Sequence, residues 1–191
     1  MLQHDSLESN KKSAAAILRF TGLNYALVYF PNIDTERINL LRKRYDPQVN
    51  LIEPHITLMF PVPEAIGENN LVNHVVSVLR NRQPFHVHLQ GLERSSDDYL
   101  FLMVQEGKAD ITSLHDEIYT DVLVAYRKAD LPYVPHLTLG VFAKNANEYP
   151  EALEAAKRLD LDYRCVLDKI HLLKINDYMT QIVWSKEFSF V

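Results

Sequence analysis

The sequence has little cysteine and little glycine, and each scarcity excludes a kind of site. Cys165 is the one cysteine in 191 residues, so the chain can form neither an internal disulfide nor a zinc site built from cysteines. The five glycines form neither G-x-G-x-x-G nor G-x-x-x-x-G-K. The glycine-rich loops that hold nucleotide phosphates in many enzymes are therefore excluded.

Long hydrophobic runs and an excess of positive charge are also missing. No apolar run approaches the ~18 residues that span a bilayer, and no long apolar segment follows a basic start. We therefore expect no secretory signal, no membrane partner and a cytoplasmic location. The net charge of −5 argues against non-specific coating of nucleic-acid backbones, which needs a basic surface. Any contact with a nucleotide or with RNA must be local.

The composition is that of a globular domain, with 47% hydrophobic and 24% charged residues. We expect a flexible segment over residues 1–20 and a single bilobal domain over residues 21–191, acting as a monomer. Strands alternate with helices and hairpins occur in both halves, which predicts an α+β fold with antiparallel or mixed sheets. Hydrophobic periodicity predicts helices over 37–44, 64–82, 110–126 and 148–159, and strands over 24–30, 51–60, 85–92, 99–104, 135–142, 163–174 and 180–190.

One motif occurs twice. Pro-His-Ile-Thr-Leu at 54–58 recurs as Pro-His-Leu-Thr-Leu at 135–139. Each copy precedes a predicted helix, a strand, a turn that ends in Asp-Tyr at Tyr99 or Tyr178, and a further strand. This order indicates a duplicated unit. We expect two lobes related by a pseudo-twofold axis, with two sheets facing a central cleft, helices outside, and the two H-x-T strands meeting at the centre.

The motif residues can carry acid–base chemistry. Residues i and i+2 of a strand share a face, so His55 lies beside Thr57, and His136 lies beside Thr138. Imidazole titrates near neutral pH, so one ring can take a proton from water while the other gives one to a leaving alkoxide. Threonine hydroxyls can donate to phosphoryl oxygens but are poor metal ligands. The four side chains predict phosphodiester chemistry without a metal or another cofactor.

Paired H-x-T motifs on strands of a bilobal chain resemble the 2H phosphoesterase superfamily. Within it, the sequence is most similar to the 2′-5′ RNA ligase and 2′,3′-cyclic phosphodiesterase-like proteins, from about Asn24 to the C-terminus. The resemblance implies a two-lobed α+β fold, a metal-free site, and hydrolysis or formation of 2′ phosphoester linkages. The implied catalytic residues are His55, Thr57, His136 and Thr138. The implied substrate is a nucleotide or an RNA end with a cyclic phosphate.

The residues after the motifs favour a small substrate. Many RNA-ligase-like members carry a basic residue shortly after the motif, whereas this chain has Met59-Phe60 and Gly140-Val141-Phe142. A cyclic nucleotide therefore fits better than a long RNA. Four further residues are candidates for substrate binding, each with a structural alternative: Tyr133, Tyr178, Tyr99 and Lys144.

Other interpretations remain open. The same cleft could bind a nucleotide such as AMP without turnover, as a sensor module, or could support metal-dependent hydrolysis. His86 and His88 share a strand face and form half of a possible metal site, although a solvated face is the simpler interpretation. The basic residues 42–44 are expected on a solvated helix face. His171 is expected to have a packing role.

Overall fold

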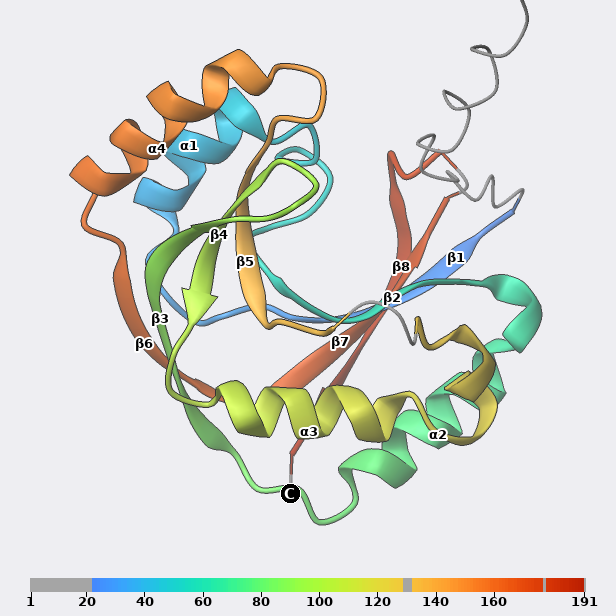
Figure 1. Cartoon of the computed structure of the whole chain (residues 1–191). Helices are drawn as coiled ribbons and strands as arrows, with labels where there is room; N and C mark the ends of the chain where they lie inside the picture. Colours follow the sequence, from blue (N-terminus) through green and yellow to red (C-terminus); the bar gives the residue numbers. More distant parts are fainter. Residues whose placement is uncertain (1–21, 129–131, 177, 191) are drawn as a thin grey trace, which may run out of the picture.

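The computed structural model describes residues 22–128, 132–176 and 178–190. The predicted flexible segment 1–20 lies outside these residues. The α+β class is confirmed, and Figure 1 shows the helices outside a curled sheet. The strands are β1 (Asn24–Tyr29), β2 (Ile56–Pro63), β3 (Phe85–Arg94), β4 (Tyr99–Val104), β5 (His136–Val141), β6 (Asp162–Leu167), β7 (Lys169–Ile175) and β8 (Ile182–Ser189). The α-helices are α1 (Glu36–Tyr45), α2 (Glu68–Leu79), α3 (Lys108–Ile118) and α4 (Tyr149–Arg158), with 3₁₀ turns at Glu64–Ile66, Asp121–Tyr126 and Ala146–Glu148.

The eight strands of the described residues form one sheet, in the order β6-β3-β4-β5-β2-β1-β7-β8, and each paired neighbour is antiparallel. The two separate sheets that we expected are therefore wrong. The two motif strands β2 and β5 pair directly, through Ile56 and Leu137, and this pairing joins the halves into one sheet. We call β2-β1-β7-β8 the β2 half and β5-β4-β3-β6 the β5 half.

The helices cross between the halves. Helix α1 leaves β1 of the β2 half yet packs on β5, and α3 leaves β4 of the β5 half yet packs on β2. Helix α4 lies beside α1, and α2 lies beside α3, so one pair covers each half (Figure 1). The motif strands are thus covered by helices from the opposite part of the chain.

The alternation of the motif strands explains where the core lies. Ile56, Leu58, Leu137 and Leu139 are all fully buried, so the polar motif residues must face the other side of the sheet. The predicted apolar face of α1 is also buried, with Ile38 fully buried. Burial of apolar side chains on the helix-covered face is what fixes the register of the motif strands.

Two predicted elements are wrong, and the strand predicted over 51–60 begins only at Ile56. The helix expected over 110–126 ends at Ile118, and Asp121 has a positive φ of 44°, which an α-helix does not accept. The strand expected over 163–174 is two strands, because the chain leaves β3 after Leu167 and begins pairing with β8 at Lys169. The hairpin β7-β8 consequently occupies the outer edge of its half, whereas β4 of the other hairpin lies beside β5.

The described residues contain no helix that is long and apolar enough to cross a membrane.

Candidate active site

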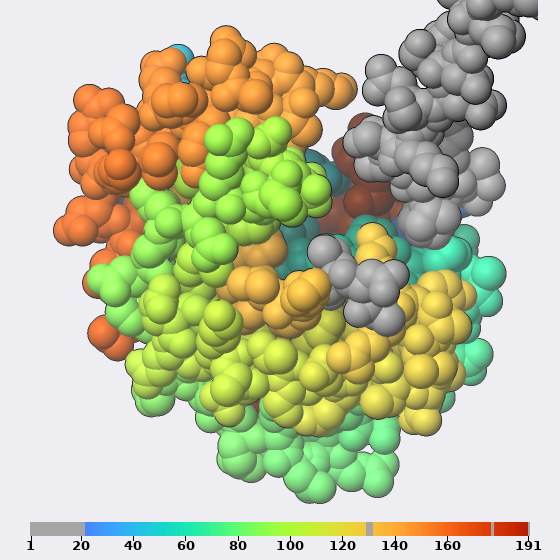
Figure 2. All heavy atoms as spheres, in the orientation of Figure 1, coloured from blue at the N-terminus to red at the C-terminus, as the bar shows by residue number. Residues whose placement is uncertain are grey.

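The four motif side chains lie together. His55, Thr57, His136 and Thr138 all line one cavity of about 760 Å³ on the face of the sheet opposite the core. Figure 2 shows the hollow between the green hairpin of β3 and β4 and the gold residues that follow α3. The cavity is within the range of ~300–1,000 Å³ that holds small ligands. The expected meeting of the two motifs at the centre of the molecule is therefore what the fold produces.

The two imidazoles are held in the same way. His55 Nδ1 lies 2.8 Å from the carbonyl oxygen of Glu53, and His136 Nδ1 lies 2.6 Å from that of Val134. A carbonyl can only accept, so in each ring Nδ1 carries the proton and donates it. Each carbonyl belongs to the residue two positions earlier, so the duplicated sequence reproduces the contact. In both neutral rings Nε2 is left as the free basic atom.

The surroundings of the two rings differ. Phe101 of β4 stacks on His136, with ring centroids 3.6 Å apart and planes at 22°. Phe30 meets His55 edge-on at 6.2 Å. The His136 ring is therefore fixed by a neighbouring strand, whereas His55 depends more on the loop that precedes it.

The electrostatic surroundings differ as well. Burial lowers the pKa of His55 to about 4, and the positive charge of Arg42 adds to this effect while Asp46 opposes it. Burial also lowers the pKa of His136, but there the nearby carboxylate of Glu93 raises it in part. Both rings thus favour the neutral form without ligand. An acidic group opposes the shift at each ring, and at His55 the positive charge of Arg42 counters that group.

The predicted binding residues divide into two groups. Tyr99 and Tyr133 line the cavity. Tyr178 and Lys144 do not, and Tyr178 is 80% exposed. The turn that carries Tyr178 does reach the cavity, because Met179 of this turn and Ile182 of β8 line it, but the Tyr178 side chain itself is exposed to solvent. The match between Tyr99 and Tyr178 in the sequence is therefore not a match in space.

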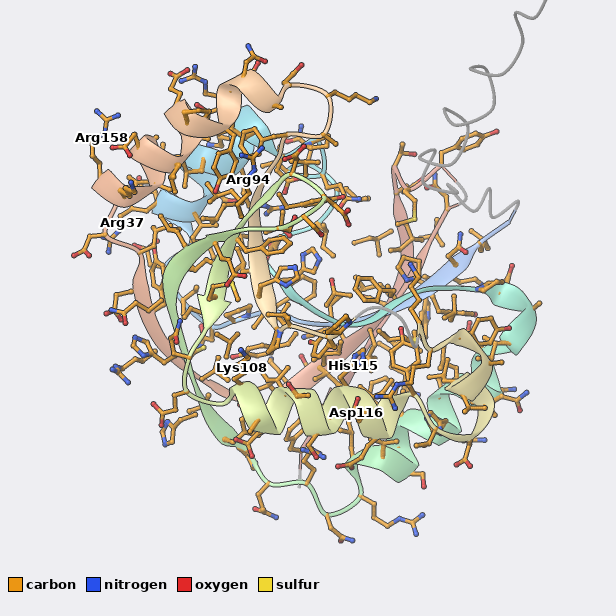
Figure 3. All side chains as sticks on the ribbon, in the orientation of Figure 1. Arg37, Arg94, Lys108, His115, Asp116 and Arg158 are labelled. Carbon is orange, nitrogen blue, oxygen red and sulfur yellow. The ribbon has the colours of Figure 1, made fainter. Side chains whose placement is uncertain are left out.

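Tyr133 connects the two motifs. Its hydroxyl donates to the carbonyl of Thr57 at 2.8 Å, and its ring stacks on His115 at 3.7 Å with planes 2° apart. His115 lies on the face of α3 that is turned toward the sheet, and its Nδ1 donates to the carbonyl of Leu58 (Figure 3). The segment that carries the second motif is thereby tied to the strand of the first.

Sequence reasoning missed several cavity residues, of which Arg42 is the most unusual. We expected residues 42–44 on a solvated face, and this is wrong for Arg42, which is only 2% exposed and lines the cavity. Lys43 and Arg44 are exposed as expected. The helical period could have indicated that Arg42 is buried. Arg42 follows the buried Ile38 by four residues and precedes Asp46 by four, so the three residues lie on one face of the helix. His115, Phe101 and Glu93 carried no motif that could have identified them.

The histidine pair on β3 also differs from expectation. His88 is buried rather than solvated, and its Nε2 lies 2.8 Å from Asp162 Oδ1, while His86 is exposed. Across residues 22–128, 132–176 and 178–190, no three His, Cys, Asp or Glu side chains are grouped so that they could hold a metal ion. His171 contacts Phe30, with ring centroids 5.0 Å apart, and lies outside the cavity lining.

Related sequences carry similar names. Residues 30–178 match the 2′-5′ RNA ligase superfamily. A protein of Bacillus cereus strain B4264 named "Putative phosphoesterase" is 31% identical over 156 residues, which cover 79% of this chain and 88% of that protein. A protein of Bacillus mycoides strain KBAB4 with the same name is 30% identical over 155 residues, with 79% and 88% covered.

Solved structures share the fold. E. coli LigT complexed with 3′-AMP has a TM-score of 0.55 at 15% identity, covering 90% of this chain and 95% of that chain. A crystal structure titled as a phosphoesterase has a TM-score of 0.55 at 14% identity, covering 90% and 99%. These matches agree with the duplicated motif and with the cavity that both of its copies line. The chain therefore belongs to the 2′-5′ RNA ligase superfamily within the 2H phosphoesterases, a family of phosphoesterase and ligase type.

Proposed function

We propose that the protein is a metal-independent phosphoesterase that hydrolyses 2′,3′-cyclic phosphates of nucleotides or of RNA ends. The observation that carries the proposal is the matched pair of imidazoles. Each donates through Nδ1 to the carbonyl two residues earlier, and each lines the same cavity with a threonine hydroxyl beside it. Two free Nε2 atoms and two hydroxyl donors form a site for a phosphoryl group.

The reaction requires one neutral and one protonated ring. His55 Nε2 accepts a proton from water as the water oxygen forms a bond to phosphorus, and the bond from phosphorus to one ribose oxygen breaks. His136 Nε2–H gives its proton to that departing oxygen. Thr57 and Thr138 donate to the phosphoryl oxygens, where negative charge increases in the transition state. The product is a phosphomonoester, and proton exchange with solvent restores the two rings.

The surroundings support this assignment of roles. Arg42 and burial favour the neutral form of His55, as a general base requires, whereas Glu93 favours a proton on His136, as a general acid requires. A phosphodiester anion between the rings would raise the pKa of both rings, and the fixed positive charge of Arg42 would oppose this rise at His55. Binding of the substrate would thus create the productive combination of protonation states.

The dimensions of the site support a nucleotide as substrate. LigT structures are titled as complexes with 3′-AMP, ATP and NADP+, and a cavity of about 760 Å³ can accept such a ligand. The rings of Tyr99 and Phe101, with centroids 5.7 Å apart, line the cavity and can contact a base or a ribose. All four proposed catalytic residues come from one chain, so a monomer has a complete site.

A nucleotide sensor without turnover is the second candidate. It is favoured by the lowered pKa of both histidines, because two neutral rings leave no proton for a leaving group. Hydrolysis separates the two functions.

The test is a panel of 2′,3′-cyclic nucleotides and cyclic-phosphate-ended oligonucleotides, assayed with the wild type and with His55→Ala in the presence of EDTA. The proposal predicts release of a phosphomonoester by the wild type, unaffected by the chelator, and loss of this release in the variant. Binding of the cyclic nucleotides without product would favour the sensor. Activity that disappears with EDTA and returns with a divalent ion would overturn the metal-free mechanism.

A further inference from the structure

We propose that Arg42 is the positioning residue of the first motif, which holds the loop that carries His55 and keeps a fixed positive charge beside the imidazole. The catalytic consequence rests on the proposed function. The effect on the His55 ring does not, because it can be measured without substrate.

The arginine is fixed at two of its three nitrogens. Its Nε donates to Asp46 Oδ2 at 2.8 Å, and its Nη2 donates to the carbonyl of Ile52 at 2.8 Å. Asp46 is itself held, because its Oδ1 accepts from the backbone N–H of Gln48 at 2.8 Å. The side chains of Arg42 and Asp46 are 2% and 5% exposed, so the pair is shielded from water. The guanidinium therefore has one position rather than several.

The hydrogen bonds of Arg42 to Asp46 and Ile52, which we call the anchor, act on His55 through the backbone. Ile52, whose carbonyl Arg42 binds, is adjacent to Glu53, whose carbonyl accepts from His55 Nδ1. A shift of Ile52 would move the carbonyl that sets the tautomer and orientation of the ring. His136 has a different support, since the loop before it is tied through Tyr133 to Thr57.

The anchor also connects the two halves of the sheet. Arg42 belongs to α1, which packs on β5 so closely that a Cβ on Gly140 would lie 2.8 Å from Tyr45 Cβ. From this position in the β5 half, the arginine reaches the loop that leads into β2. The loop before the first motif is thus held relative to the strand of the second.

The third nitrogen of Arg42, Nη1, indicates that the arginine does more than form a structural ion pair. Arg42 Nη1 is buried and has no hydrogen-bond partner among the residues that the structure describes, which costs ~1–3 kcal/mol or more for a charged group. An apolar side chain of similar volume would avoid this cost, since buried ion pairs are often no more stabilising than hydrophobic replacements. The other cations of the described cavity wall have different contacts, with Arg94 bound to Asp98 and Lys128 over the ring of Phe60. A buried charge beside the general base is useful if it keeps that base free of its proton.

The charges around His55 define the expected direction. The charged and titratable groups near the His55 ring come from several elements. Arg42 belongs to α1, and Asp46 follows the end of that helix. His136 lies on β5, and His171 lies on the other side of Phe30. The arginine lowers the pKa of His55, in addition to the larger effect of burial, while the aspartate raises it. Removing the arginine charge would leave the aspartate unopposed, so the pKa of His55 must rise.

The experiment compares the wild type with Arg42→Gln, Arg42→Lys and the control Arg44→Gln, which changes an exposed arginine of the same helix. The protonation of His55 is read at pH 5 from the ¹⁵N and ¹H shifts of its side chain. We expect a neutral ring in the wild type, in Arg42→Lys and in the control, and a larger protonated fraction in Arg42→Gln. A protonated fraction in a folded Arg42→Gln protein that equals that of the wild type would overturn the proposal.

Arg42→Lys tests the anchor separately from the charge. Lysine keeps the charge but cannot bind Asp46 and Ile52 in the same fork geometry. We expect kcat for a 2′,3′-cyclic nucleotide to fall about tenfold or more, with KM changed less than threefold, while Arg44→Gln has wild-type kinetics. Wild-type kcat in Arg42→Lys would contradict the positioning role. This variant also decides the matter if Arg42→Gln does not fold.

The outcomes separate this inference from the proposed function. If the wild type hydrolyses no cyclic phosphate, the proposed function fails, and the NMR comparison at pH 5 still decides whether Arg42 controls His55. If the wild type is active and His55 has the same protonation in Arg42→Gln, only the further inference fails.

Discussion

The two motifs have almost the same sequence and different surroundings. Both histidines donate from Nδ1 to the carbonyl two residues earlier, so the repeated pentapeptide reproduces the tautomer. Around His55 the neighbours are a buried arginine–aspartate pair and an aromatic edge, and around His136 they are a stacked phenylalanine and a glutamate. The repeat thus supplies two equivalent bases, and non-repeated residues make them unequal. This inequality is what acid–base catalysis by a pair of histidines needs.

The largest expected effect comes from removing either ring. General acid–base catalysis contributes about 10²–10⁴-fold per group, so His55→Ala and His136→Ala should each lower kcat by at least ~10²-fold. The double variant should lose less than the product of the two losses, because the rings act as a unit. Steady-state kinetics on a cyclic nucleotide measures this. Near wild-type turnover in the double variant would show that the rings bind phosphate without moving protons.

The threonines should matter less than the histidines. Thr57→Ala or Thr138→Ala would remove one hydrogen bond to the phosphoryl group. Loss of one such donor costs roughly 10²–10³-fold in kcat. Thr57→Ser and Thr138→Ser are matched controls that retain the hydroxyl and should keep most of the activity. A threonine-to-alanine variant slower than both histidine variants would contradict the order of roles.

The pH dependence follows from the lowered pKa values of both rings. His55 must be neutral, so kcat/KM should fall tenfold per unit below its pKa of about 4. His136 must be protonated, and its pKa in the free enzyme lies below 6.5, so kcat/KM should also fall above that pKa. The limbs belong to the coupled pair, and the basic limb of kcat should lie at higher pH, because the bound phosphate favours a proton. A rate that rises steadily to pH 9 would contradict the assignment.

The close contact between α1 and β5 can be tested by stability. In Gly140→Ala the new Cβ would lie 2.8 Å from both Tyr45 Cβ and the Phe142 ring, and overpacking of this kind costs about 1–3 kcal/mol. Chemical denaturation should show this loss in the free energy of unfolding. Unchanged stability would mean that the helix and the strand are not in contact.

The smallest effect is expected for the link between the motifs. Tyr133→Phe removes the hydrogen bond to the Thr57 carbonyl and leaves the stack on His115, which should cost about 0.5–1.5 kcal/mol. Tyr178→Phe is the control, because that side chain is 80% exposed. Equal melting temperatures for the two variants would show that the link contributes nothing.

The sequence predicted the parts of the fold that depend on short-range patterns. The alternation in Pro-His-Ile-Thr-Leu was enough to place Ile56 and Leu58 in the core and His55 opposite them. The single sheet was not predicted, because it results from a pairing between Ile56 and Leu137 that no local pattern encodes. The strand over 163–174 was wrong for the same reason, since its two parts pair in different halves.

The candidate site was predicted to the same degree. The four motif residues lie in one cavity because their spacing within each strand sets their faces. Arg42 was missed because a run of three basic residues is usually solvated, and burial of one of them depends on α1 crossing to the other half. Tyr178 was assigned to binding from its place in the repeat, but its side chain is exposed, whereas the adjacent Met179 lines the cavity.

The unequal roles of the two histidines are tested most directly with a substrate that needs no general acid. In a nucleoside p-nitrophenyl phosphodiester the leaving group departs as a stable anion, so only the base is required. The ratio of kcat/KM for this ester to that for the cyclic phosphate is measured in the wild type, His55→Ala and His136→Ala. Our account predicts that His136→Ala recovers most of the wild-type rate on the activated ester while His55→Ala does not. Recovery in His55→Ala instead, or in neither variant, would contradict it.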